Sequence, residues 1–339
     1  MHISNAFGVN PLPVLGAGIA IPAGGCAIQP GSYRPLTFGG KPRTEIPAGA
    51  LAISDPLDGL SVRARESLTV DLMIGWDGAS PTVNHHALQT TFLLKGDHLG
   101  RRTLYPAGQA LQRLFLSGVD VQADTPATLV AFGDSITAGQ QSSQDANHRY
   151  PDLLHERMLT HPTLAHVAMT NRGISGNRLL RDRGGPSGVS RFARDVLGTT
   201  GVRAAIVLIG LNDIILPEAG DMFGPHVTAD EMIAGYTVLL DAARIAGVRM
   251  IGGTILPFGA NARWTEAGEA TRLAINDWIR DSGAWDAVID FDAAVRDPDD
   301  PRRMCEAFTA QGGLHPRDDG YIAMAGAADF AILAHVLGD

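Results

Sequence analysis

The chain has 339 residues, which exceeds the usual size of a single domain and favours two domains. A formal net charge of −9 argues against nucleic-acid binding, because that function requires a basic surface that neutralises phosphates. Hydrophobic residues make up 45% of the sequence, enough for a sizeable core, but no apolar run reaches about 18 residues, so we expect no membrane span.

The start of the chain carries no targeting signal. Residues 1–5 lack a positively charged segment followed by an apolar run. As the sequence stands we expect a cytoplasmic protein, or a periplasmic or secreted one if a leader has been removed. Cys26 and Cys305 lie far apart in the sequence, and we expect both to be buried free thiols.

Residues 1–124 consist of short strand-like segments separated by clusters of glycine and proline. The strand-like segments are 3–8, 67–74, 89–94 and 114–121. In residues 67–74 apolar and polar side chains alternate, as in a strand that is buried on one face. Short strands with frequent turns are typical of a β-sandwich. We therefore expect an all-β, jelly-roll-like accessory domain over residues 1–124, and leave its role open.

Residues 125–339 form the second predicted domain, and the boundary is expected in the proline-containing segment 124–127. Short apolar runs, typical of buried strands, alternate there with segments of helical periodicity. The predicted strands are 128–132, 165–170, 204–209, 248–254 and 287–291. The predicted helices are 150–159, 189–197, 229–245, 266–282 and 320–337. This alternation predicts an α/β fold, a parallel sheet with helices on both faces.

Four chemically useful residues follow the predicted strands or precede the last helix. They are Ser135, Gly176, Asn212 and His315. Because the carboxyl ends of parallel strands meet at one edge of a sheet, we expect these residues to lie together. A hydroxyl, a glycine N–H, a carboxamide and an imidazole are the groups that acyl transfer requires.

Each of these residues also has an ordinary structural interpretation. Ser135 suits the N-cap of a helix, because serine is a preferred capping residue. Gly176 and Asn212 suit turns, and His315 suits a surface position before a helix. The joint occurrence of all four favours the catalytic interpretation over these alternatives.

The four sequence blocks around these residues resemble the SGNH (GDSL) hydrolase family, which is named for its Ser, Gly, Asn and His. The matching blocks are 133–137 (GDSIT), 174–176 (ISG), 210–213 (GLND) and 314–316 (LHP). The phrases at 147–154, 173–180 and 278–292 are similar to the bacterial esterase branch that carries an N-terminal β-domain. The resemblance covers residues 128–339 and implies a flavodoxin-like sheet.

The resemblance also implies a role for each matching residue. Ser135 is the nucleophile and His315 is the general base. The oxyanion hole consists of the N–H groups of Ser135 and Gly176 and the side-chain amide of Asn212. Asp134 and Asp213, which adjoin these residues, are interpreted as structural support.

One position departs from the family pattern. The family's last block usually reads Asp-x-x-His, and the aspartate orients the imidazole, but here the triad-acid position is Gly312. Three explanations stay open: a Ser–His dyad helped by a backbone carbonyl near Gly312, an acid from elsewhere, or a substitution that impairs the enzyme. The nearest acids in sequence are Glu306, Asp318 and Asp319.

The sequence thus predicts a serine esterase for short acyl esters, with acetyl the favoured acyl group and a carbohydrate as its carrier. The alternatives are a lysophospholipase or thioesterase with the same groups, and a catalytically impaired binding protein. No metal-ligand spacing and no phosphate-binding GxGxxG loop occur, so we expect neither metal nor cofactor. Acyl length, the alcohol and the oligomeric state are left open.

Overall fold

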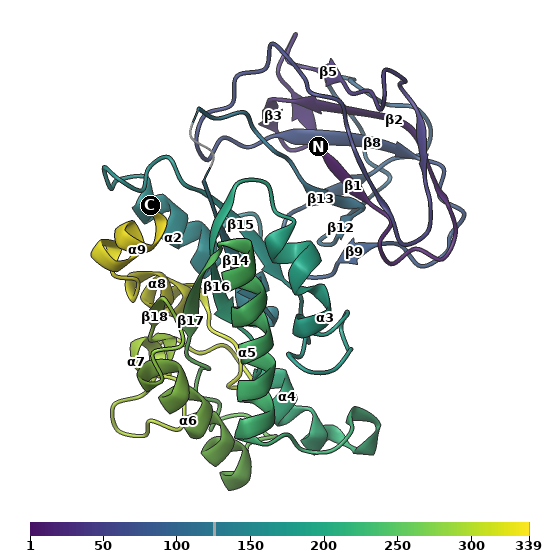
Figure 1. The fold of residues 1–339 in the computed structure, drawn as a ribbon. Coiled ribbons are helices and arrows are strands. Elements are labelled where there is room, and N and C mark those ends of the chain that lie inside the picture. Colours follow the sequence, from purple (N-terminus) through teal and green to yellow (C-terminus); the bar gives the residue numbers. More distant parts are fainter. Residues whose placement is uncertain (125–126, 339) are drawn as a thin grey trace. The chain divides into compact units, whose positions relative to one another are not determined.

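The computed structural model describes residues 1–124 and 127–338 and divides the chain into two compact units. They are Met1–Gln122 and Ala123–Asp339 (Figure 1). The expected linker, 124–127, includes Thr125 and Pro126, which lie outside the described residues. Each unit has a hydrophobic core of its own, so each is described by itself.

Unit 1 is built from antiparallel strands. One sheet contains β1 (His2–Ser4), β7 (Leu51–Ile53) and β13 (Leu116–Gly118). A second contains β2 (Leu12–Ala20), β5 (Arg34–Pro35), β6 (Thr44–Ile46) and β8 (Thr69–Ile74). The short pairs are β3 (Pro22–Gly24) with β4 (Ala27–Ile28), β9 (Val83–Asn84) with β12 (Arg113–Leu114), and β10 (Thr91–Leu93) with β11 (Gly108–Ala110). Both larger sheets contribute to one core, which confirms the predicted β-sandwich.

Two strand boundaries in unit 1 differ from the prediction. The first strand ends at Ser4, because the buried Asn5 side chain donates hydrogen bonds to the carbonyls of Asn10, Ile46 and Pro47 and turns the chain. The segment predicted as one strand over 114–121 is divided at Phe115, whose φ of 60° lies in the left-handed region and cannot continue a strand.

Unit 2 contains a five-stranded parallel sheet. Its strands are β14 (Thr128–Gly133), β15 (Ala168–Gly173), β16 (Val202–Leu208), β17 (Arg249–Gly253) and β18 (Ala287–Ile289). Their order, β15-β14-β16-β17-β18, is that of flavodoxin-like sheets. Strands β14 and β16 lie inside the sheet and are almost wholly buried, which explains their continuous apolar sequences. The predicted α/β fold is confirmed.

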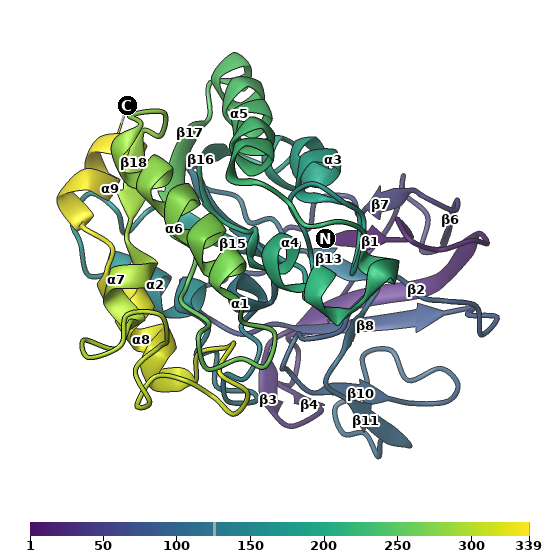
Figure 2. The same cartoon turned by 90° about the horizontal axis from the view of Figure 1, so that it is seen from below.

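Helices cover both faces of this sheet (Figure 1, Figure 2). On one face, α3 (Gly188–Phe192) and its π-helical continuation Ala193–Leu197 pack with α5 (Ala229–Ala246) and α6 (Glu266–Asp281). The other group is α2 (Tyr150–Met158), α8 (Asp318–Gly326) and α9 (Phe330–Leu337). Shorter helices follow the strand ends: α1 (Ser135–Ala138), α4 (Leu211–Ile215), the 3₁₀ turns Pro217–Ala219 and Asp221–Phe223, and α7 (Phe291–Val295).

Three predicted elements of unit 2 are corrected. The second strand begins at Ala168 and not at Ala165, because residues 161–167 form hydrogen-bonded turns. The fifth ends at Ile289, and Asp290 caps the helix that follows. The predicted last helix is two helices with a bend of 66° between them. The helix is divided there because the Asp329 carboxylate accepts hydrogen bonds from N–H groups in the first turn of α9.

A helix that crosses a membrane must be both long and apolar. None of the described helices is by itself long and apolar enough to cross one. Helices α8 and α9 reach the required length and apolar composition only when they are counted together as one bent pair.

Candidate active site

Ser135 is the first residue of α1, directly after strand β14. The residue that caps this helix is Asp134, whose Oδ1 accepts a hydrogen bond from the N–H of Ile136 at 3.0 Å. Asp134 therefore takes the capping role that was one interpretation of Ser135. A Cβ at position 133 would clash with the Leu208 carbonyl of β16. Because Gly133 lacks this atom, the turn lies close against the sheet.

His315 lies next to this serine although the two are 180 residues apart. Its Nε2 is 2.9 Å from the Oγ of Ser135, which is a hydrogen-bond distance. His315 belongs to a tight turn, in which the N–H of Ala310 donates to the His315 carbonyl at 2.9 Å. The structure therefore pairs the hydroxyl and the imidazole that the sequence singled out.

Asn212 connects the segment that contains Gly176 to the turn that contains Ser135. Gly176 has a φ of 74°, and a Cβ there would meet no atom within 4 Å, so backbone conformation and not space favours glycine. Asn212 Nδ2 donates to the carbonyl of Asn177 at 3.0 Å and, over a longer 3.4 Å, to Asp134 Oδ2. Among the described residues, none accepts a hydrogen bond from the backbone N–H of Ser135 or Gly176.

Asp213 joins the asparagine segment to the glycine segment. Its carboxylate accepts hydrogen bonds from the N–H groups of Leu179 (2.6 Å) and Leu180 (3.1 Å), and Arg178 Nε lies 3.7 Å away. Burial raises the pKa of Asp213 to about 6, against the lowering effect of these hydrogen bonds. Burial, with the nearby Asp213 charge, raises the pKa of Asp134 to about 7.

Arg191 is a supporting residue that sequence reasoning missed. Its buried guanidinium donates to the carbonyls of Gly133 (2.7 Å) and Arg172 (2.8 Å) and to Asn177 Oδ1 (2.8 Å). An ion pair with Asp195 at 2.9 Å, in the π-helical turn, compensates its charge. A single arginine in a helix ordinarily faces solvent. No pattern in the local sequence therefore indicates that Arg191 links the ends of two strands.

Unit 2 contains two further buried arginines, Arg178 and Arg149. Arg178 Nη1 donates to the carbonyl of Phe223 at 2.7 Å, and Arg149 Nη1 pairs with Asp152 at 2.8 Å. Arg178 therefore holds the 3₁₀ turn at Phe223, and Arg149 pairs within the first turn of α2. Cys26 and Cys305 are free but only half-buried, which corrects the expectation of full burial.

Gly312, at the triad-acid position, has a φ of 93° and open space where a Cβ would lie. Its carbonyl accepts a hydrogen bond from Asn261 Nδ2 at 2.7 Å. Of the three neighbouring acids, Asp318 pairs with a different histidine, and Glu306 and Asp319 are exposed. Among the described residues, no group of three or more His, Cys, Asp or Glu side chains is arranged to hold a metal ion.

The sequence model of the GDSL-like Lipase/Acylhydrolase family matches residues 131–323, more than half of the chain. A solved carbohydrate acetylesterase family member from Sinorhizobium meliloti is similar, with 15% identity and a TM-score of 0.50, over 62% of this chain and 99% of that chain. A G-D-S-L family protein from Desulfitobacterium hafniense DCB-2 has 19% identity and a TM-score of 0.45 over 62% and 99%. No curated protein matches the chain significantly.

Proposed function

The chain belongs to the GDSL-like lipase/acylhydrolase family, and we propose that it is a serine esterase that hydrolyses short acyl esters. The observation that carries this proposal is the 2.9 Å hydrogen bond between Ser135 Oγ and His315 Nε2. A serine hydroxyl is a weak nucleophile at neutral pH, and an adjacent imidazole that accepts its proton activates it.

In the first half-reaction, Ser135 Oγ attacks the ester carbonyl while its proton passes to His315 Nε2. The tetrahedral oxyanion accepts hydrogen bonds from the N–H groups of Ser135 and Gly176 and from the side-chain amide of Asn212. The C–O bond to the alcohol then breaks, and His315 gives its proton to the departing oxygen. An acyl ester on Ser135 remains.

In the second half-reaction, water attacks this acyl ester and gives a proton to His315. The same three donors hold the second oxyanion. When the bond to Ser135 Oγ breaks, His315 returns the proton to the serine, and the carboxylic acid leaves. Asn212 Nδ2 has a long 3.4 Å contact with Asp134. In this mechanism the amide gives up that contact when it donates a hydrogen bond to the oxyanion.

The activating pair is proposed to work without a carboxylate at Gly312. In this account the enzyme is a Ser135–His315 dyad, and the site is weakened relative to a full triad. Replacing the acid of a complete triad reduces turnover by about 10⁴-fold, so a slow enzyme is expected. The catalytic set is nevertheless present, which favours slow hydrolysis over binding alone.

Acetyl esters, and acetylated carbohydrates in particular, are the substrates that we propose to assay first. The S. meliloti structure is described as a carbohydrate acetylesterase family member, but a shared fold does not determine a substrate. The decisive assay compares hydrolysis of p-nitrophenyl acetate by the wild type and by Ser135→Ala.

We expect turnover by the wild type and a loss of at least 10³-fold in the variant, about what removal of a nucleophile costs. Esters of longer acyl chains, acetylated sugars and acyl thioesters are then compared by kcat/KM. A preference for long chains or thioesters would support the lysophospholipase or thioesterase alternative. No turnover of any of them by the folded protein would support the impaired binding protein.

A further inference from the structure

The turn that carries His315 contains two adjacent glycines, Gly312 and Gly313. Their φ angles, 93° and 66°, lie in the region that favours glycine. Gly312 has no side chain that could anchor the turn, and a turn of this composition has many other conformations available to it. Within the turn, the N–H of Ala310 donates to the His315 carbonyl and the N–H of Gly313 to the Ala310 carbonyl, and a contact from outside further restricts its conformation and thereby the position of His315.

Asn261 makes the contact that does this. Its Nδ2 donates to the Gly312 carbonyl at 2.7 Å, and the next residue, Gly313, packs so closely that a Cβ would lie 2.6 Å from the Ala260 backbone. The turn is thus bonded at one glycine and confined at the other. Both contacts come from the segment 258–264, which follows strand β17.

The amide of Asn261 is itself fixed. Its Oδ1 accepts a hydrogen bond from the N–H of Arg263 at 3.1 Å, which orients the side chain. Its backbone N–H donates to the carbonyl of Phe258 at 2.8 Å, and its carbonyl accepts from Trp264 at 3.0 Å. Asn261 therefore presents Nδ2 to Gly312 from an ordered turn, in a hydrogen bond that is exposed to solvent.

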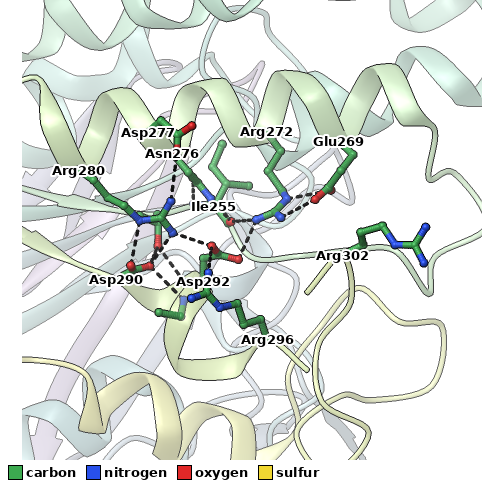
Figure 3. Close-up of polar contacts among 12 residues, drawn as sticks. Ile255, Glu269, Arg272, Asn276, Asp277, Arg280, Asp290, Asp292, Arg296 and Arg302 are labelled. Carbon is green, nitrogen blue, oxygen red and sulfur yellow. Dashed lines mark hydrogen bonds and ion pairs between the residues drawn. The ribbon is translucent and has the colours of Figure 1, made fainter. Parts of the chain in front are cut away.

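A buried ionic network holds Ile255, which lies between strand β17 and the segment 258–264 (Figure 3). Asn276 of α6 bonds both the N–H (2.7 Å) and the carbonyl (2.9 Å) of Ile255. Arg272 Nη1 donates to the same carbonyl at 3.1 Å and to Asp292 at 2.8 Å. Glu269 pairs with Arg272 at 2.6 Å, so the buried charges are compensated. The segment that positions Asn261 is thus anchored to helix α6.

We propose that Asn261 is a positioning residue for His315. It acts through the Gly312 carbonyl and holds the turn that an aspartate side chain at position 312 would otherwise help to order. The proposal rests on the proposed esterase function of Ser135 and His315. It assigns to this chain a structural substitute for the orienting role of a triad acid.

The test measures p-nitrophenyl acetate hydrolysis by Asn261→Ala and Asn261→Asp. Aspartate keeps the acceptor for Arg263 N–H but has no N–H for the Gly312 carbonyl. We expect kcat to fall about fivefold to tenfold in both, as for the loss of one hydrogen bond, with KM and Tm close to wild type. Arg263→Ala is the matched control, because Arg263 contributes its backbone N–H and not its side chain, and its kcat should stay at the wild-type value.

A double-mutant cycle separates positioning from general stabilisation. In the His315→Ala background, Asn261→Ala should not change the residual rate, because the histidine that it positions is gone. An equal loss in both backgrounds would overturn the proposal, as would a wild-type kcat in the two Asn261 variants. If the wild type and Ser135→Ala hydrolyse equally, the esterase proposal has failed instead.

Discussion

Asp318 Oδ2 lies 2.7 Å from Nδ1 of His148, a histidine in the loop that follows helix α1. Its other oxygen accepts the N–H of Ser143 at 2.8 Å. These hydrogen bonds outweigh the effect of burial and keep the pKa of Asp318 below its ordinary value, so the carboxylate is charged at neutral pH. Asp318 therefore joins the loop after Ser135 to the helix after His315.

Asp318→Asn tests whether this residue is the missing triad acid. We expect kcat on p-nitrophenyl acetate to fall less than tenfold, because Asp318 is engaged with His148 and Ser143. Loss of a triad acid would reduce it by about 10⁴-fold. Steady-state kinetics at pH 8 distinguish the two outcomes, and a fall of 10³-fold or more would return Asp318 to the catalytic set.

Gly312→Asp tests the vacant acid position itself. Its φ of 93° strains any residue with a Cβ, so the comparison must be with Gly312→Asn, which has the same shape and the same strain. We expect the aspartate variant to exceed the asparagine variant about tenfold or more in kcat, because only the carboxylate stabilises the imidazolium. Equal rates in the two variants would show that position 312 is not an empty triad position.

Asn212→Ala tests the proposed side-chain donor of the oxyanion hole. Removing one such donor from a serine hydrolase costs about 2.7–4 kcal/mol, so we expect kcat to fall 10²- to 10³-fold with little change in KM. Circular dichroism and Tm confirm that the variant folds. A rise in KM with kcat unchanged would mean that Asn212 binds the substrate without stabilising the transition state.

Asp134 predicts a pH dependence of stability. Its pKa rises from 3.8 to about 7 on burial, so the folded protein binds this proton more tightly than the unfolded chain. The contribution of protonated Asp134 to the unfolding free energy is complete below pH 3.8 and is lost as the pH rises towards 7. Relative to wild type, Asp134→Asn should therefore gain unfolding free energy as the pH rises from 5 to 8. Urea unfolding measures this difference, and a constant difference across that range would contradict it.

The sheet could be predicted from the sequence because its central strands consist mostly of apolar residues. Strands β14 and β16 are buried on both faces, and the apolar residues that make up most of their sequences indicate this burial. Residues 165–167 adjoin strand β15 but form turns, and Asp329 divides a helix whose periodicity continues past it. Local patterns identify buried segments better than they identify the point where an element begins or ends.

The candidate site could be predicted only in part. Motifs after a predicted strand and before the last predicted helix marked Ser135 and His315, and the structure places Ser135 Oγ 2.9 Å from His315 Nε2. No such motif marks Arg191 and Asn261, because the carbonyls that their side chains bond are brought close only by the folded chain. Supporting bonds of this kind depend on tertiary structure, which residue spacing alone does not show.

The central claim is that His315 activates Ser135 as a nucleophile, and covalent labelling tests it most directly. The wild type, Ser135→Ala and His315→Ala are incubated with a fluorophosphonate, and the modified peptide is located by mass spectrometry. We predict an adduct on Ser135 in the wild type, none in Ser135→Ala, and labelling at least 10²-fold slower in His315→Ala. A folded wild type with no adduct on Ser135, or equally fast labelling without His315, would contradict the account.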